Sequence, residues 1–174
     1  MLFRSEAFTA AARRQPEDAL RHARITLGYA DALGISFECL RWAWPLATRV
    51  AYELSDRAAT IELLTLLDSQ QPGHLAPMLG AERDLVRARL AAHDGDAAAA
   101  AAFASAIGGL REQSTPYHLA QGLLDHAEHL TRLADADAAT LAIDEARDIA
   151  RSLRCQPLLD RAADMTPTEA RARQ

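Results

Sequence analysis

One short segment holds four potential metal ligands: Asp125, His126, Glu128 and His129. In a helix, Asp125 and His129 lie one turn apart on the same face, a spacing that allows two side chains to bind one zinc-like ion. His118 lies upstream, but it is ~16 Å from His129 along a helix axis and cannot complete the same site. We therefore interpret this segment as the solvated face of a helix and predict no metal site.

Two tryptophans precede a proline that falls in the middle of a predicted helix. Trp42 and Trp44 lie just before Pro45, whose ring removes a backbone hydrogen bond and predicts a kink. With Arg41 and Arg49 nearby, the indoles either line a pocket for a peptide or ligand, or fill the core where the kink opens a gap. We keep both interpretations, and Trp42 and Arg49 are candidate partner-binding residues.

A second candidate surface combines two arginines with two residues of the following hairpin. Arg83 and Arg87 are one helical turn apart, and they would present a basic stripe to a partner that carries carboxylates. Gln121 and Asp125 occupy the next predicted hairpin and extend this candidate surface. The alternative is that these charged residues are simply the solvent-facing side of their helices.

The sequence contains no arrangement typical of a catalytic or nucleotide-binding site. Serine and histidine occur without GxSxG, the carboxylates are spread along helices, and no GxxxxGK[ST] phosphate loop is present. The glycine pair Gly108-Gly109 falls within a helical pattern, without the flanking strand or the lysine that a phosphate-binding loop needs. We therefore expect no catalytic residue, no cofactor and no enzymatic activity in this chain.

Composition favours an all-α domain and argues against nucleic acid and membrane as partners. Hydrophobic residues make up 49% of the 174 residues and aromatic residues only 5%, with alanine and leucine prominent, which suits helices better than strands. A net charge of −5 opposes binding to phosphate backbones. The two cysteines are isolated, and no apolar stretch is long enough to cross a bilayer, so we expect a cytoplasmic protein.

Helix-starting residues recur at an interval of about 40. Segments that open at Pro16, Asp56, Asp96 and Asp137 each follow a helix-like stretch, and Asp is a good N-cap while Pro suits the first helical turn. Breaks at Gly34, 71–73, 114–116 and 155–157 lie between them. The pattern predicts helices at residues 6–14, 17–33, 36–54, 56–69, 77–93, 96–112, 116–134, 137–153 and 157–164.

Apolar residues within these segments recur every three or four positions, so each helix has one face to bury. A single hairpin cannot bury such a face, and neighbouring hairpins must stack. The sequence thus predicts an all-α, right-handed α-solenoid of antiparallel helical hairpins with about 40 residues per repeat. We place this domain at residues 1–165 and a tail at 166–174.

The Asp94-Gly95-Asp96 turn before an Ala-rich helix, and the segment 146–162, resemble a known family. They are similar to the tetratricopeptide-like arrays on the C-terminal side of large bacterial signalling ATPases, such as ATP-dependent LuxR-type and cyclase-linked regulators. The resemblance covers most of the chain, although a tetratricopeptide unit usually has ~34 residues. It implies a non-catalytic arm that binds a protein, peptide or small inducer on a concave face.

Three functions follow as alternatives. The first is the sensor or interaction arm of a signalling ATPase or transcription regulator. The second is a stand-alone adaptor similar to a co-chaperone. The third is an accessory part of a cyclase or ATPase whose catalytic domain lies outside this chain.

Both ends of the sequence suggest a fragment. Residues 1–5 are what a start codon joined to the end of a common sequencing adapter would encode, and residues 165–170 resemble the opening of a LuxR-type DNA-binding domain. Neither end has the polar cap that terminal repeats need, so we expect self-association through exposed apolar ends.

Overall fold

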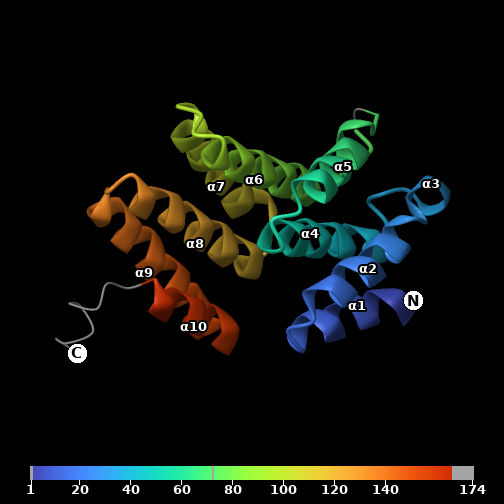
Figure 1. Cartoon of the computed structure of the whole chain (residues 1–174), viewed down its shortest axis with the longest axis horizontal. Coiled ribbons are helices and arrows are strands. Elements are labelled where there is room, and N and C mark those ends of the chain that lie inside the picture. Colours follow the sequence, from blue (N-terminus) through green and yellow to red (C-terminus); the bar gives the residue numbers. More distant parts are fainter. Residues whose placement is uncertain (1, 72, 166–174) are drawn as a thin grey trace. The chain divides into compact units, whose positions relative to one another are not determined.

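Helices form the regular structure of the described chain. The computed structural model describes residues 2–71 and 73–165, and no strand occurs within these ranges. The prediction of an all-α protein is therefore confirmed. Figure 1 shows the helices in chain order. They are α1 (Leu2–Ala12), α2 (Pro16–Leu27), α3 (Ala30–Leu33), α4 (Glu38–Glu53), α5 (Arg57–Asp68), α6 (Pro77–His93), α7 (Ala99–Gln113), α8 (Pro116–Arg132), α9 (Ala136–Ser152) and α10 (Gln156–Asp164).

The helix predicted over residues 17–33 is in fact two helices. Helix α2 ends at Leu27. The amide of Tyr29 donates to the carbonyl of Thr26 at 3.2 Å, so this turn spans three residues, where an α-helix spans four. Gly28 stands at this break, and glycine is a poor helix former by about 1 kcal/mol relative to alanine. The short helix α3 follows and ends at Leu33, and its C-cap Gly34 has a φ of 77°.

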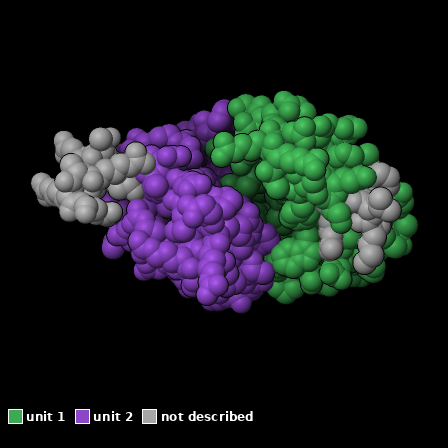
Figure 2. Space-filling model, turned by 90° about the horizontal axis from the view of Figure 1, so that it is seen from below, with its two compact units in different colours: residues 1–86 green, residues 87–174 purple. Residues whose placement is uncertain are grey.

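The chain forms two compact units, residues 1–86 and residues 87–174, drawn in green and purple in Figure 2. The division falls within α6. The single repeat domain predicted over residues 1–165 stays a prediction, and the predicted tail at 166–174 lies outside the described residues.

Unit 1 is built by helices that pack in chain order. Helix α1 packs on α2, α2 on α4, and α4 on α5, while α1 also contacts α4. Trp44 is fully buried on α4, and its indole Nε1 donates to the carbonyl of Leu63 on α5 at 2.8 Å. This bond satisfies the polar atom of the largest side chain in the unit's core.

Unit 2 repeats the same order of packing. Helix α7 packs on α8, α8 on α9, and α9 on α10, while α8 also contacts α10. Phe103, Leu110 and Leu124 are its largest fully buried side chains. Buried alanines, which let helix axes approach closely, recur on α8, α9 and α10: Ala120, Ala127, Ala146, Ala150 and Ala162.

One kind of turn recurs along the described chain. Helices α1, α4, α6, α8 and α9 are each followed by a residue with positive φ: Arg14, Ser55, Gly95, Ala134 and Arg154. In each turn this residue donates its amide three residues back, and the next residue donates five residues back, at 2.9–3.3 Å. This pair of bonds is the Schellman motif. The first four turns are separated by 41, 40 and 39 residues, the interval that the sequence predicts.

The residue after the left-handed position often caps the next helix as well. Asp56 accepts from the amide of Ala59 at 2.9 Å, and Asp135 accepts from the amide of Ala138 at 3.2 Å. The predicted opener Asp137 is therefore wrong, because the cap lies two residues earlier and Asp137 belongs to the first turn of α9. The predicted start at Asp96 is also early, since α7 begins at Ala99.

Candidate functional site

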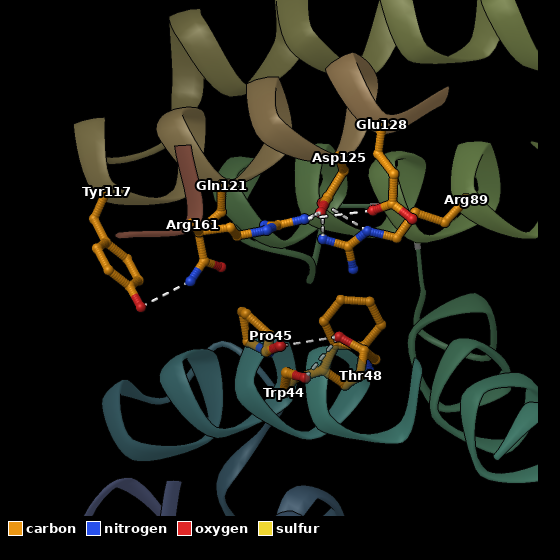
Figure 3. Close-up of polar contacts among 9 residues, drawn as sticks. All are labelled: Trp44, Pro45, Thr48, Arg89, Tyr117, Gln121, Asp125, Glu128 and Arg161. Carbon is orange, nitrogen blue, oxygen red and sulfur yellow. Dashed lines mark hydrogen bonds and ion pairs between the residues drawn. The ribbon is translucent and has the colours of Figure 1, made fainter. Parts of the chain in front are cut away.

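Asp125 is a buried carboxylate bound by two arginines. It lies on α8 with only 6% of its surface exposed, and it accepts from Nε of Arg89 on α6 at 2.7 Å. Nη2 of Arg161 on α10 donates to its other oxygen at 2.6 Å. Figure 3 shows both guanidinium groups pointing at this carboxylate. The interpretation of Asp125 as part of a solvated face is therefore wrong.

Each charged group of this cluster depends on an oppositely charged partner. Arg89 is 4% exposed, so both it and Asp125 have lost most of their hydration. Such a loss is offset only by short, well-directed bonds between opposite charges. Each arginine is 36 residues from Asp125, one before and one after, so three helices at similar intervals along the chain supply the cluster.

The cluster continues outward into accessible polar side chains on α8. Nη2 of Arg161 lies 3.8 Å from Oε2 of Glu128, whose side chain is 52% exposed. About one and two turns before Asp125 on α8 lie Gln121 and Tyr117, where Nε2 of Gln121 donates to the hydroxyl of Tyr117 at 2.7 Å. Tyr117, Gln121, Asp125 and Glu128 fall within about a quarter of the helix circumference at 3.6 residues per turn. We call these four residues the α8 polar stripe (Figure 3).

The two arginines of the predicted basic stripe fall in different units. Arg83 lies in unit 1, with Nη1 3.8 Å from Asp68 and Nε 3.4 Å from Asp84. Arg87 is exposed at the start of unit 2. Gln121 and Asp125 belong to unit 2. Of the predicted set, Gln121 and Asp125 belong to the site described above.

Trp42 and Trp44 differ in how far they are buried. Trp44 belongs to the core, as the packing interpretation predicts. Trp42 is half-buried, and the guanidinium carbon of Arg41 lies 5.3 Å from the centroid of its ring, which is cation–π geometry. Pro45 stands inside α4, and the hydroxyl of Thr48 donates toward the carbonyls of Trp44 and Pro45, each at 3.1 Å (Figure 3). Arg49 is half-buried, and its role as a candidate stays a prediction.

Two histidines of α8 pack against the phenyl ring of Phe103 on α7. His126 and His129 both stack on Phe103 of α7, with ring centroids 5.2 Å apart in each pair. Burial lowers the pKa of each imidazole below 6.5, with a smaller contribution from His129 to the pKa of His126 and from Arg132 to that of His129. Across the described residues, no group of three or more His, Cys, Asp or Glu side chains could hold a metal ion.

Sequence reasoning missed Arg89, Arg161 and Phe103. The two arginines carry one usable signal, because they lie 36 residues on either side of Asp125 and have the opposite charge. Phe103 sits in an alanine run, where an isolated aromatic residue marks a point of close packing.

Comparison with protein-family models and with curated protein sequences found no match to this chain. No described helix combines the length and apolar character needed to cross a membrane.

Proposed function

We propose that the chain is a tetratricopeptide-like α-solenoid, right-handed and built from hairpins of about 40 residues, that serves as a non-catalytic interaction scaffold. The recurrent Schellman turn at residues 14, 55, 95 and 134 carries the proposal, since its spacing of 41, 40 and 39 residues is that of a repeat. The packing order supports it. In unit 1, α1 contacts α2, α2 contacts α4, and α4 contacts α5; in unit 2, α7 contacts α8, α8 contacts α9, and α9 contacts α10. The first helices of successive hairpins also touch, α1 with α4 and α8 with α10.

The α8 polar stripe is the surface that we assign to the partner. Its accessible members offer a hydroxyl, an amide and a carboxylate, while the partly exposed Arg161 adds a cation. Such a mixture suits a peptide or a small polar inducer, both of which present donors and acceptors. The buried Asp125 fixes the arginine that borders this surface, because its carboxylate holds the guanidinium of Arg161.

The resemblance to signalling ATPases supports one setting for the scaffold. In that setting the chain is the sensor or interaction arm of a larger ATPase or transcription regulator. The alternatives are a stand-alone adaptor and an accessory part of a cyclase or ATPase.

Site-specific photocrosslinking tests the assigned surface. A photoreactive residue replaces Tyr117, which is 41% exposed on the stripe, or Leu141, which is 73% exposed on α9 and serves as the control. In cells that express the chain, we expect a defined partner to be crosslinked from position 117 and not from position 141. The same partner should be lost when Gln121→Arg is added. Equal crosslinking from both positions, or no effect of Gln121→Arg, would contradict the assignment.

A further inference from the structure

The contact between α7 and α8 includes three stacked rings. Phe103 is 1% exposed, and the planes of His126 and His129 are inclined to its ring by only 16° and 24°. The two histidines are three residues apart, so they occupy one face of α8. A single aromatic side chain of α7 is thereby covered by two groups that can each gain a proton.

His129 is poorly placed to carry a charge. Its surface is 6% exposed, and its Nε2 has no hydrogen-bond partner among the described residues. A proton on this atom would create a buried donor and a buried cation without an acceptor. The face of Phe103 attracts a cation, but this attraction replaces only a small part of the lost hydration.

Nearby charges do not supply a counter-ion. On α8 itself, Arg132 and His126 would repel a protonated His129. Asp125 is already held by arginines from α6 and α10, and Glu128 pairs with Arg132 and lies near Arg161. On the packed helices α7 and α9, Arg111 pairs with Glu145, Arg147 with Asp144, and Arg151 with Asp148. The remaining carboxylates of these helices, Glu112 and Asp137, are exposed to solvent.

We propose that Phe103, His126 and His129 form an acid-sensitive contact that holds α7 on α8 while both imidazoles are neutral and weakens when they are protonated. The direction follows from linkage. Burial lowers the pKa of both groups below 6.5, so between the lowered value and 6.5 the unfolded chain binds more protons than the folded chain. The stabilising effect is fully present above pH 6.5 and is lost as the pH falls through this window.

The experiment combines a titration with unfolding. The ring protons of each histidine are followed by NMR from about pH 8 to pH 4, and urea unfolding of the full chain is measured at about pH 7.5 and about pH 5.5. We expect His126 and His129 to titrate below 6.5. For each pH unit by which a pKa is lowered, the ratio of folded to unfolded chain should fall by up to about tenfold.

Variants separate this contact from the other histidines. His129→Leu should remove a large part of the loss between the two pH values. His93→Gln changes an exposed histidine on α6, and His118→Gln changes a buried one elsewhere on α8, so both should keep the loss of the unaltered chain.

Two results would overturn the proposal. One is that His126 and His129 titrate at or above 6.5. The other is that His118→Gln, and not His129→Leu, removes the dependence on pH. If His129→Leu does not fold, the NMR titration of the unaltered chain still decides, because it needs no substitution.

Discussion

Asp125 is a carboxylate that the folded chain keeps from water and binds with two arginines. Replacing it with alanine leaves Arg89 buried without its main partner. We expect Asp125→Ala to lower the free energy of unfolding by about 3–5 kcal/mol, as is usual when one side of a buried ion pair is removed. Urea denaturation followed by circular dichroism measures this change.

A matched surface change and a double change complete the test. Asp144 pairs with Arg147 but is 56% exposed, so Asp144→Ala should change stability by no more than about 1 kcal/mol. Asp125→Leu combined with Arg89→Met should recover much of the loss, because it removes both fully buried charges and leaves only Arg161, whose side chain is 31% exposed. A loss in the double variant as large as that of Asp125→Ala would contradict the interpretation.

Residues with a positive φ give a second prediction at the scale of one residue. Ala134 has a φ of 60°, a conformation that costs an L-residue roughly 1–2 kcal/mol, whereas Gly95 occupies the equivalent turn without that cost. We expect Ala134→Gly to stabilise the chain by about 0.5–1 kcal/mol and Gly95→Ala to destabilise it by about 1 kcal/mol. A Cβ on Gly95 would meet no atom within 4 Å, so any loss reports the backbone alone. Thermal unfolding of both variants is the measurement, and shifts of the same sign would refute the account.

The sequence predicts single residues less well than helices. Apolar spacing assigns one buried face to each helix, and this hides Asp125 and the buried His118 and His129. The physical reason is that α8 contacts α7, α9 and α10, so it is buried around most of its circumference. The pairing with Arg89 and Arg161 depends on packing between helices, which local spacing does not encode.

At the scale of the element, the capping residue decides where α9 begins. Asp135 accepts from the amide of Ala138, while Asp137 is exposed in the first turn. We expect Asp135→Ala to cost about 1 kcal/mol and Asp137→Ala only a few tenths, since Asp137 loses just its interaction with the helix dipole. Urea unfolding of the two variants compares them directly. A greater cost for Asp137→Ala would restore the boundary predicted from the sequence.

Several helix boundaries follow from the sequence because proline, glycine and capping residues act locally. Thr115 caps α8, and Pro16 begins α2, both at predicted breaks. Ser55 and Ala134 have no local signal for a positive φ, since neither type favours it. The helix break at Gly28 was missed because a single glycine is also tolerated inside helices.

At the scale of the whole molecule, the proposed repeat array makes each hairpin depend mainly on its neighbours. In a domain with one shared core, loss of any element instead affects all the others. Unit 2 can distinguish these cases, because its helices pack in chain order from α7 to α10.

Hydrogen exchange of a chain that ends at Arg154 is the most direct test of the repeat array. This change removes α10, which contacts α9 and α8. In a repeat array, amide protection should fall most in α9, less in α8 and least in α7. Equal loss of protection in α7, α8 and α9 would show a single cooperative core and would contradict the solenoid.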